Sequence, residues 1–336
     1  MSGADPLVRL LTPEGGHVVP SGELAEALAG LGRSDCPITW IHARMSAAVV
    51  QALDDMGLDE IAVKSLRDGP ERPRVEEFAD HLYISLFSAG KPVGTRRGDE
   101  DEGALGGGKL PRLQDLRLFL GPRWVISVGH IHDADYEMLA HRVRRQVFSR
   151  ERGPSFIAYH ICEWLVETLQ PALEELDGRI DGLEDQVVLE TGTVPMQKLF
   201  TLKRDLVDLR RRVAPLRDVM QALGAHGVLY VDPATEAYFR DVHDDVMRVI
   251  ELLDTYREIL SSALDLHLSS VSNRMNRVMK QLTVVATMFM PLSFIVGLFG
   301  TNFTRMPFGS LIWFILMFVL MFISVVLLLV YTWRRT

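Results

Sequence analysis

The stretch LTVVATMFMPLSFIVGLF (residues 282–299), the tripeptide Gly300-Thr301-Asn302 and the stretch LIWFILMFVLMFISVVLLLVYTW (residues 311–333) decide the fold of this chain. Each apolar stretch is long enough to cross a bilayer, because about 20 apolar residues at 1.5 Å rise per residue span the hydrocarbon core. We therefore expect a transmembrane domain over residues 281–336, with a first span at about 281–300, an outer loop at 300–310 and a second span at about 311–333.

The overall composition of the chain looks like that of a soluble protein and hides these two stretches. The 336 residues are 24% charged and carry a formal net charge of -8, and the mean hydropathy is +0.11. No basic segment followed by an apolar core stands at the start, so we expect no secretory signal peptide. The acidic balance argues against a nucleic-acid partner and suits a protein that attracts cations. We find no nucleophile motif, phosphate loop or cysteine pair, and expect neither an enzyme nor a bound cofactor.

Basic residues beside the spans predict the orientation, because Lys and Arg close to a span are retained on the cytoplasmic side. They are Arg274, Arg277 and Lys280 before the first span, and Arg334 and Arg335 after the second. The turn holds only Arg305. We therefore expect a multi-pass protein of the inner membrane with both termini in the cytoplasm. In that reducing compartment Cys36 and Cys162 are predicted to be buried thiols rather than a disulfide.

Short apolar runs alternate with helical patterns in the first part of the chain, which predicts a cytoplasmic α/β domain over residues 1–153. Runs rich in β-branched and aromatic residues predict strands at 38–42, 81–87, 116–120 and 124–128. Amphipathic patterns predict helices at 45–56 and 136–148. Segment 89–111 is rich in Gly and charge and cannot bury an apolar face, so we expect a mobile loop there.

Long helical patterns follow, and they predict a helical stalk region over residues 154–280. We expect one helix over 155–189, kinked at Pro171, and a second over 196–223. Asp232-Pro233 is a start signal, and no break follows until Pro291. A helix from 233 to 299 would be on the order of 100 Å long, so it should pack against other helices and continue into the bilayer.

One face of the first span carries small and polar residues. Residues seven apart form two adjacent lines on it, namely Asn276, Thr283, Met290 and Gly297, and Met279, Ala286, Ser293 and Gly300. The opposite face is bulky and suits lipid. Small residues also let transmembrane helices pack closely, and periodicity alone favours that use over the lining of a pore.

Two further arguments favour a pore. Asn276 and Asn302 lie at opposite ends of this face, where rings of amides can replace part of the water around an ion. Two spans per chain cannot enclose a pathway, so a pore needs one helix from each copy around an axis, which is a closed cyclic oligomer. The expected partners are therefore further copies of the chain and the lipid bilayer.

Several runs after residue 158 resemble one family of membrane proteins. They are YHIC (159–162), APLR (214–217), YFRDV (238–242), SSVSNRMN (269–276), VMKQLT (278–283) and Gly300-x-Asn302-Phe303. These runs resemble the CorA superfamily of divalent-cation channels, and the resemblance extends from about Thr39 to the C-terminus. It implies an α+β membrane protein that forms a funnel-shaped cyclic homopentamer with a cytoplasmic α/β domain and long stalk helices. The first span then lines the pore, and the second lies outside it.

The resemblance also implies roles for single residues. Gly300, Thr301 and Asn302 would select the cation at the outer mouth. Asp241 matches an acidic position at contacts between copies, where bound Mg2+ holds the pore shut. The pore-lining and gating positions are Asn276, Leu282, Met290 and Ser293, with Thr283 and Gly297 on the same face. Without the resemblance, the charge pattern favours a solvated helix face around Asp241, with Asp244 paired to Arg248.

The resemblance implies transport of divalent cations, with Mg2+ first, together with Co2+ and Ni2+, and with cations as possible regulators. Magnesium-transporting members carry Gly-Met-Asn, whereas position 301 is Thr here, Phe308 stands where an acidic residue commonly follows Met-Pro, and Arg305 adds a positive charge. These departures are similar to the ZntB branch, so Zn2+ transport, with or without proton coupling, is the alternative. Oxygen ligands suit Mg2+, while the imidazole and thiolate groups that Zn2+ prefers are missing from the predicted pore face.

Two other interpretations stay open. The chain could be a membrane-anchored metal sensor whose pore does not conduct. His130 and His132, with Asp133, alternate at the end of a predicted strand and could hold a transition metal. A plain turn is the commoner use of such residues after a strand.

Overall fold

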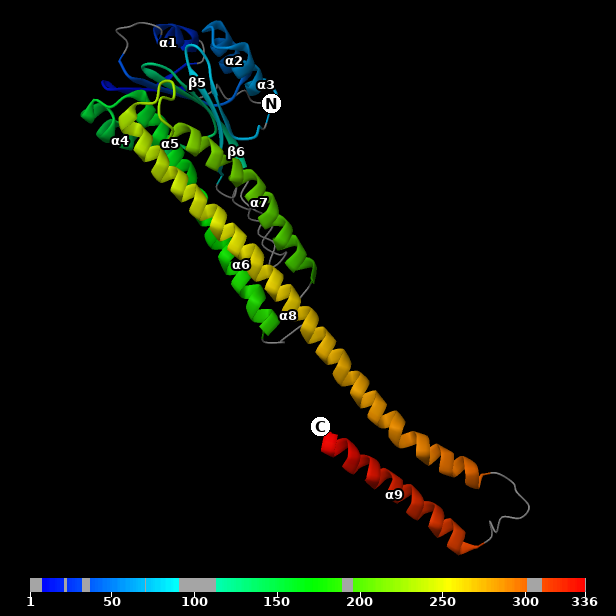
Figure 1. Cartoon of the computed structure of the whole chain (residues 1–336). Coiled ribbons are helices and arrows are strands. Elements are labelled where there is room, and N and C mark those ends of the chain that lie inside the picture. Colours follow the sequence, from blue (N-terminus) through cyan, green and yellow to red (C-terminus); the bar gives the residue numbers. More distant parts are fainter. Residues whose placement is uncertain are drawn as a thin grey trace. The chain divides into compact units, whose positions relative to one another are not determined.

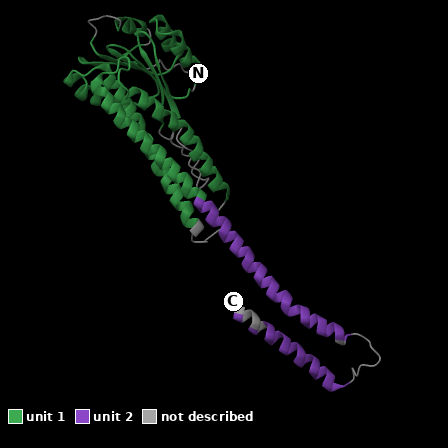
Figure 2. Cartoon of the chain, viewed as in Figure 1, with its two compact units in different colours: residues 1–261 green, residues 262–336 purple. Residues whose placement is uncertain are grey.

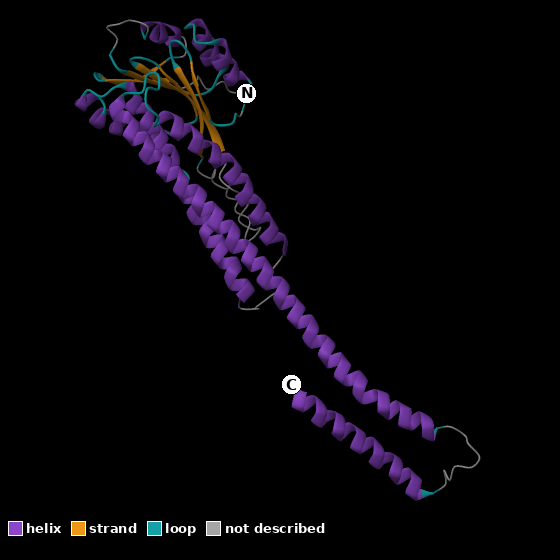
Figure 3. Cartoon of the chain, in the orientation of Figure 1, coloured by secondary structure: helices purple, strands orange, loops and turns teal. Residues whose placement is uncertain are grey.

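A mixed β-sheet with helices on both faces is followed by long helices in this computed structural model (Figures 1 and 3). It describes residues 8–20, 23–31, 37–69, 71–90, 113–188, 196–300 and 310–335. Nearly all of the predicted mobile loop 89–111 lies outside the described residues. The chain forms two compact units, residues 1–261 and 262–336 (Figure 2). The domain boundaries expected after residues 153 and 280 stay predictions.

The sheet has seven strands in the order β2-β1-β3-β7-β6-β5-β4. Their bounds are β1 Val8–Thr12, β2 Gly15–Val19, β3 Thr39–Ala43, β4 Arg74–Glu77, β5 Leu82–Ala89, β6 Leu113–Leu120 and β7 Trp124–Gly129. β3 and β7 are parallel, with Ile41 beside Ile126, and the other neighbours are antiparallel. All residues of β3, β5 and β7 are buried, as expected for strands covered on both faces. The four predicted strands are confirmed.

Alternate residues of the sheet pack against two different helical layers. Helices α1 (Leu24–Gly30), α2 (Ala47–Asp55) and α3 (Glu60–Arg67) share one apolar core with Ile41 and its neighbours on the sheet. Helices α4 (Asp133–Gln146) and α5 (Pro154–Glu167) lie on the opposite face, where the ring of Tyr136 is 5.0 Å from Trp40 and 5.6 Å from His42. Successive residues of β3 therefore point to opposite layers, as the period of a strand requires. The predicted helices at 45–56 and 136–148 are confirmed as α2 and α4.

The helix expected over residues 155–189 is observed as two helices, α5 and α6 (Gln170–Val188), separated at Thr168 and Leu169. The expectation of a single helix kinked at Pro171 is therefore wrong. Pro171 has no N–H and its ring clashes with the carbonyl of Glu167, so α5 ends at that residue. The hydroxyl of Thr168 donates to the Leu165 carbonyl at 2.6 Å, which satisfies one of the carbonyls at the helix end.

The start of α8 (Pro233–Phe299) is fixed against the start of α5. Ser155 Oγ donates to Asp232 Oδ2 at 2.8 Å, and Asp232 N lies 3.3 Å from the same hydroxyl. A side chain at Gly153 would overlap Asp232, so only glycine lets the two helix starts approach this closely. The Asp232-Pro233 start signal is confirmed, and α8 leaves the sheet from a defined position.

In the first unit α6, α7 (Met196–Leu223) and the beginning of α8 pack side by side. Leucines of α7 at spacings of three and four are buried in this interface, as the sequence predicts. Arg210 of α7 forms a two-point ion pair with Asp254 of α8 at 2.6 and 3.0 Å. Arg179 of α6 pairs with Asp205 of α7 at 3.6 Å. Ion pairs therefore add to the apolar core in fixing how the three helices face one another.

The second unit contains the end of α8 and helix α9 (Leu311–Arg335). Both helices are long and apolar enough to cross a membrane, and almost none of their apolar surface is buried within one copy. Large exposed apolar areas are costly in water, so these helices need lipid or further copies around them. The two expected spans are thus found as helices.

Burial of His42 predicts that acid destabilises the protein. Burial, with the positive charges of Arg9 and Arg44, lowers the pKa of His42 to about 3. In the unfolded chain this histidine has a pKa near 6.5 and binds a proton below that pH, whereas in the folded chain it stays neutral. The free energy of unfolding therefore decreases as the pH falls below about 6.5. We expect this histidine alone to lower the free energy of unfolding by about 1.4 kcal/mol when the pH is changed from 7.5 to 5.5. Thermal unfolding of the full chain in detergent, compared with His42→Asn, measures the difference. Equal pH slopes for the two proteins would contradict it.

Candidate cation pathway

The predicted pore face lies on one uninterrupted helix. α8 is helical from Pro233 to Phe299, although Pro291 lies inside it. Residues seven apart therefore stay on one side, and the two lines of small and polar residues share a face. All of the predicted pore-lining residues within this helix are described: Asn276, Leu282, Thr283, Met290, Ser293 and Gly297. Their roles stay predictions. Asn276, Thr283, Met290, Ser293 and Gly297 belong to the two lines and so share a face of the helix, whereas Leu282 belongs to neither line.

Within the described part of one copy, this face of α8 is open. Leu282 is 61% and Met290 77% exposed, and Asn276 and Ser293 are exposed as well. A side chain at Gly297 would meet no atom within 4 Å. Packing within one copy therefore does not explain why position 297 is glycine. A small residue there permits either the close approach of another copy or an open axis.

Threonine hydroxyls on α8 are tied to the backbone of the helix. Thr283 Oγ1 donates to the Met279 carbonyl at 2.8 Å, and Thr287 Oγ1 donates to the Thr283 carbonyl at 2.7 Å. Because each hydroxyl proton is used within the helix, the Thr283 oxygen keeps only acceptor capacity for other groups. An uncharged oxygen acceptor is the kind of group that contacts a hydrated cation without holding it tightly.

The outer mouth is described only at its first residue. Gly300 N donates to the Val296 carbonyl at 2.9 Å, which closes the last turn of α8. A Cβ atom at position 300 would lie 3.2 Å from that carbonyl, so a glycine avoids a close contact at this end of the helix. Thr301 and Asn302 lie outside the described residues, and their roles at the mouth stay predictions.

Asp241 is exposed on the part of α8 that belongs to the first unit. The expected ion pair between Asp244 and Arg248 is not the one formed, because Arg248 pairs with Asp245 and Asp244 contacts His243 at 3.2 Å. Side chains three residues apart and four residues apart are both neighbours on a helix, so Arg248 can pair with either Asp245 or Asp244. Among the described residues, no group of three His, Cys, Asp or Glu side chains could hold a metal. A metal at Asp241 would thus need ligands from elsewhere.

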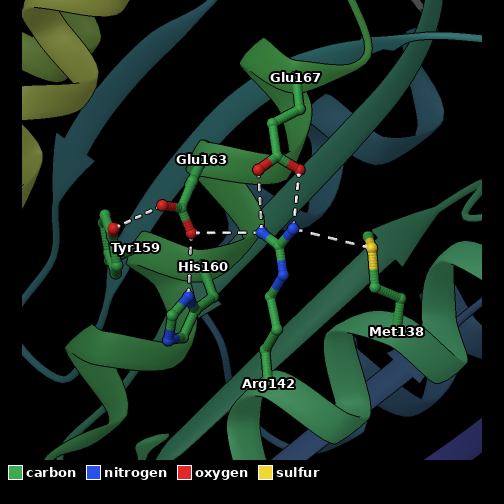
Figure 4. Close-up of polar contacts among 6 residues, drawn as sticks. All are labelled: Met138, Arg142, Tyr159, His160, Glu163 and Glu167. Carbon is green, nitrogen blue, oxygen red and sulfur yellow. Dashed lines mark hydrogen bonds and ion pairs between the residues drawn. The ribbon is translucent and has the colours of Figure 1, made fainter.

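A polar cluster that the sequence analysis missed joins α4 to α5 near this part of α8 (Figure 4). Arg142 contacts Glu167 at 3.1 and 3.2 Å and Glu163 at 3.4 Å. Glu163 also accepts from Tyr159 at 2.7 Å and contacts His160 Nδ1 at 3.2 Å. The hydrogen bond from His160 is the largest of the effects that lower the pKa of Glu163, which therefore stays ionised. The only sequence signal is the spacing of Glu163 and Glu167, which puts both carboxylates on one face.

Of the residues after β7, His132 and Asp133 make structural contacts. His132 Nδ1 accepts from Ala134 N at 3.4 Å and caps α4. Asp133 pairs with Arg9 at 2.8 Å and with Arg44 at 3.5 Å. These contacts favour the plain turn over the metal site. Of the two cysteines, Cys162 is a buried free thiol, and burial raises its pKa to about 12. Cys36 lies outside the described residues.

Comparisons with known proteins agree with this architecture. The family described as CorA-like Mg2+ transporter protein matches residues 37–334. The cobalt/magnesium transport protein CorA of Thermotoga maritima is 32% identical over 80% of this chain and 73% of its own length. The zinc transport protein ZntB of Cronobacter sakazakii is 24% identical over 77% of this chain and 72% of its own length.

A solved structure shows the same fold. The complete CorA magnesium transporter of Methanocaldococcus jannaschii superposes with a TM-score of 0.75 at 22% identity, covering 100% of this chain and 99% of that chain. The match includes the mixed sheet, the long α8 and the two C-terminal apolar helices. The family match spans most of the chain, and the Thermotoga maritima relative is alike over most of both lengths. The chain therefore belongs to the CorA family of membrane transporters.

Proposed function

We propose that the protein transports divalent metal cations across the inner membrane through a pore on the axis of a cyclic homopentamer. The observation that carries the proposal is the open small and polar face of α8, on a chain whose relatives are named as cobalt, magnesium and zinc transporters. One α8 from each copy would line the pore, with α9 outside it. Both termini would lie in the cytoplasm.

The uncovered apolar surface of the two spans, and their small number in one copy, support an assembly of several copies. One copy leaves nearly all of its apolar span surface uncovered, and two spans cannot surround a pathway. A ring of five copies would place the small and polar line of α8 on the axis and the bulky face toward α9 and lipid. Rings of oxygen from Asn276, Thr283, Ser293 and Asn302 would then contact the hydrated ion, and apolar rings at Leu282 and Met290 would gate by excluding water.

Magnesium is the first proposed substrate, with Co2+ and Ni2+. Mg2+ gives up its water reluctantly, so a pathway with uncharged oxygens and no charged side chain suits the passage of a hydrated ion. Zinc is the second candidate, and a specific observation favours it. Thr301 replaces the methionine of the magnesium members, and Arg305 stands in an outer segment without acidic residues.

Uptake by proteoliposomes tests the proposal. We expect the purified protein to carry Mg2+ inward along its gradient, and comparison across Mg2+, Co2+, Ni2+ and Zn2+ ranks the substrates. Repeating the series with an imposed proton gradient tells coupled transport from passive flow. If none of the ions is taken up while metal still changes protease sensitivity of the cytoplasmic part, the non-conducting sensor replaces the transporter.

Asp241 is proposed as a regulatory metal ligand between copies, because it is exposed on α8 and matches an acidic position of the family. Since the described residues of one copy hold no group of three metal-binding side chains, further ligands would come from elsewhere. We expect Asp241→Ala to leave the pore more open at millimolar Mg2+, since fewer carboxylates would hold the copies together. Patch recordings of Mg2+ block measure this as a severalfold higher half-inhibiting concentration. Asp244→Ala, which removes a neighbouring exposed carboxylate, is the control. Equal block in wild type and Asp241→Ala would contradict the role.

A further inference from the structure

The α6 and α7 helices flank α8 (Figure 1). Asp254 of α8 is held by Arg210 of α7, and Tyr256 of α8 lies close to Asp177 of α6. Both α6 and α7 also have exposed residues on other sides in the described part of the copy. This arrangement defines two surfaces, one on each helix.

The α7 stripe consists of Phe200, Arg204, Val207 and Arg211, which recur at spacings of four, three and four. Such residues lie on one side of a helix. Phe200 is 57% and Val207 38% exposed, and both arginines are exposed. Within the described part of one copy, neither Arg204 nor Arg211 forms an ion pair. The stripe is thus apolar and basic, and its arginines have no ion-pair partner among the described residues.

The α6 stripe consists of Glu174, Gly178, Asp181 and Asp185, with the same spacings of four, three and four. All four residues are exposed. A side chain at Gly178, or at Gly182 one turn further, would meet no atom within 4 Å. A glycine inside an exposed helix costs about 1 kcal/mol relative to alanine, and nothing within the copy requires one here. The α6 stripe is acidic, and at Gly178 no side chain covers the backbone of the helix.

The two stripes match in height. The Arg179–Asp205 pair shows which levels of the antiparallel helices α6 and α7 correspond. Counting from it, Asp181 lies at the level of Arg204, Glu174 at the level of Arg211, and Gly178 at the level of Val207. A rotation about an axis does not move a copy along that axis. For helices that run along the axis, residues at equal height in one copy therefore stay at equal height in its neighbours.

We propose that the α7 stripe of each copy packs against the α6 stripe of the next copy. This contact rests on the cyclic homopentamer proposed above and identifies a surface that holds the ring together outside the membrane. Val207 would sit over the bare backbone of Gly178, and two ion pairs, Arg204 with Asp181 and Arg211 with Glu174, would flank it. The contact joins unlike surfaces, which is the kind that closes a ring rather than a pair.

A groove beside the α6 stripe gives the neighbouring arginine room. It has a volume of about 620 Å3 and is formed by residues of α5, α6 and α8. Its lining includes Leu173, Val249 and Leu252, the carboxylates of Glu163, Glu167 and Asp245, and the guanidinium of Arg248. Leu173 directly precedes Glu174, so the groove opens at the level of Arg211. The stem of an arginine can pack on these apolar groups. The carboxylates of the groove already pair with Arg142 and Arg248 within the copy, so Glu174 remains the proposed partner of Arg211.

Cysteine cross-linking tests the contact in the full chain. In a background with Cys36→Ser and Cys162→Ala, we combine Gly178→Cys with Val207→Cys and oxidise the protein in membranes. A disulfide needs Cβ atoms about 3.5–4.5 Å apart. We expect a ladder of linked species that extends to five copies, and no ladder from either single variant. A linked species that runs as a monomer, or dimers from Gly178→Cys alone, would overturn the proposal.

Matched controls keep this test specific. Gly178→Cys with Asp218→Cys uses the same side of α7 at another height, and we expect no ladder. In the cross-linking background, Asp181→Arg should remove the ladder and the addition of Arg204→Asp should restore it, while Glu175→Arg on the other flank of α6 should leave it. A pentamer by native mass spectrometry that transports Mg2+ without giving a ladder overturns this contact alone. A protein that is not a ring overturns the proposed pore first.

Discussion

We expect Asn302→Ala to abolish uptake of Mg2+ by proteoliposomes. In the proposed pentamer one substitution removes an amide from every copy, so the whole ring at the outer mouth is lost. If each lost polar contact with the hydrated ion costs about 0.5–1.5 kcal/mol, the ring loses several kcal/mol. At about 1.4 kcal/mol per factor of ten, uptake should fall by about a hundredfold or more.

The matched control for this prediction is Asn273→Ala. It removes an amide from a position of α8 that is not among the predicted pore-lining residues. We expect uptake by this variant to stay within about twofold of the wild type, a change too small for a lost ring of ligands. Normal uptake by Asn302→Ala, with the protein correctly assembled, would mean that the amide ring does not select the ion.

The second large effect is expected from Gly297→Leu. One copy has open space at this position, so the substitution should not disturb the helix itself. In a ring, however, a leucine from each copy would fill the axis and exclude water from it. We expect uptake to fall below detection, by about a hundredfold or more, while native mass spectrometry still counts the same number of copies.

Gly297→Leu also separates pore lining from close helix packing, the two uses that periodicity leaves open. If the glycine serves only helix contacts, the leucine should break the assembly into smaller species, because small residues there let helices approach. Val285→Leu, on the bulky face of α8, is the control and should neither block nor dissociate the protein. An assembled Gly297→Leu protein that transports normally would remove Gly297 from the pathway.

The buried part of the sheet could be predicted from the sequence, while its edges could not. β3, β5, β6 and β7 are mostly buried, so their apolar runs stand out against the charged segments around them. β4 reads Arg-Val-Glu-Glu and becomes a strand because β5 pairs with it and α7 contacts this edge. β2 includes two glycines and gains its order from β1. Such strands depend on neighbours that are distant in sequence.

The sites outside the sheet could likewise be predicted only in part from the sequence. The face of α8 follows from residue spacing, because one helix carries all of it and its period is known. The cluster of Arg142, Glu163 and Glu167 does not, since the arginine belongs to α4 and the carboxylates to α5. Only packing against the sheet brings these two helices together. The α6 and α7 stripes are intermediate: each is visible in the sequence, but their common height requires the folded stalk.

The unbroken α8 also limits how the chain can vary in length. Each residue of a helix turns it by about 100°. One residue inserted between Asp241 and Asn276 would therefore change the helical angle of every later residue of α8 by that amount. In the proposed pore, the small and polar face would then turn away from the axis. An insertion of seven residues would nearly restore the direction. In the proposed pore, the direction of the pore-lining side chains would therefore depend on the number of residues in α8.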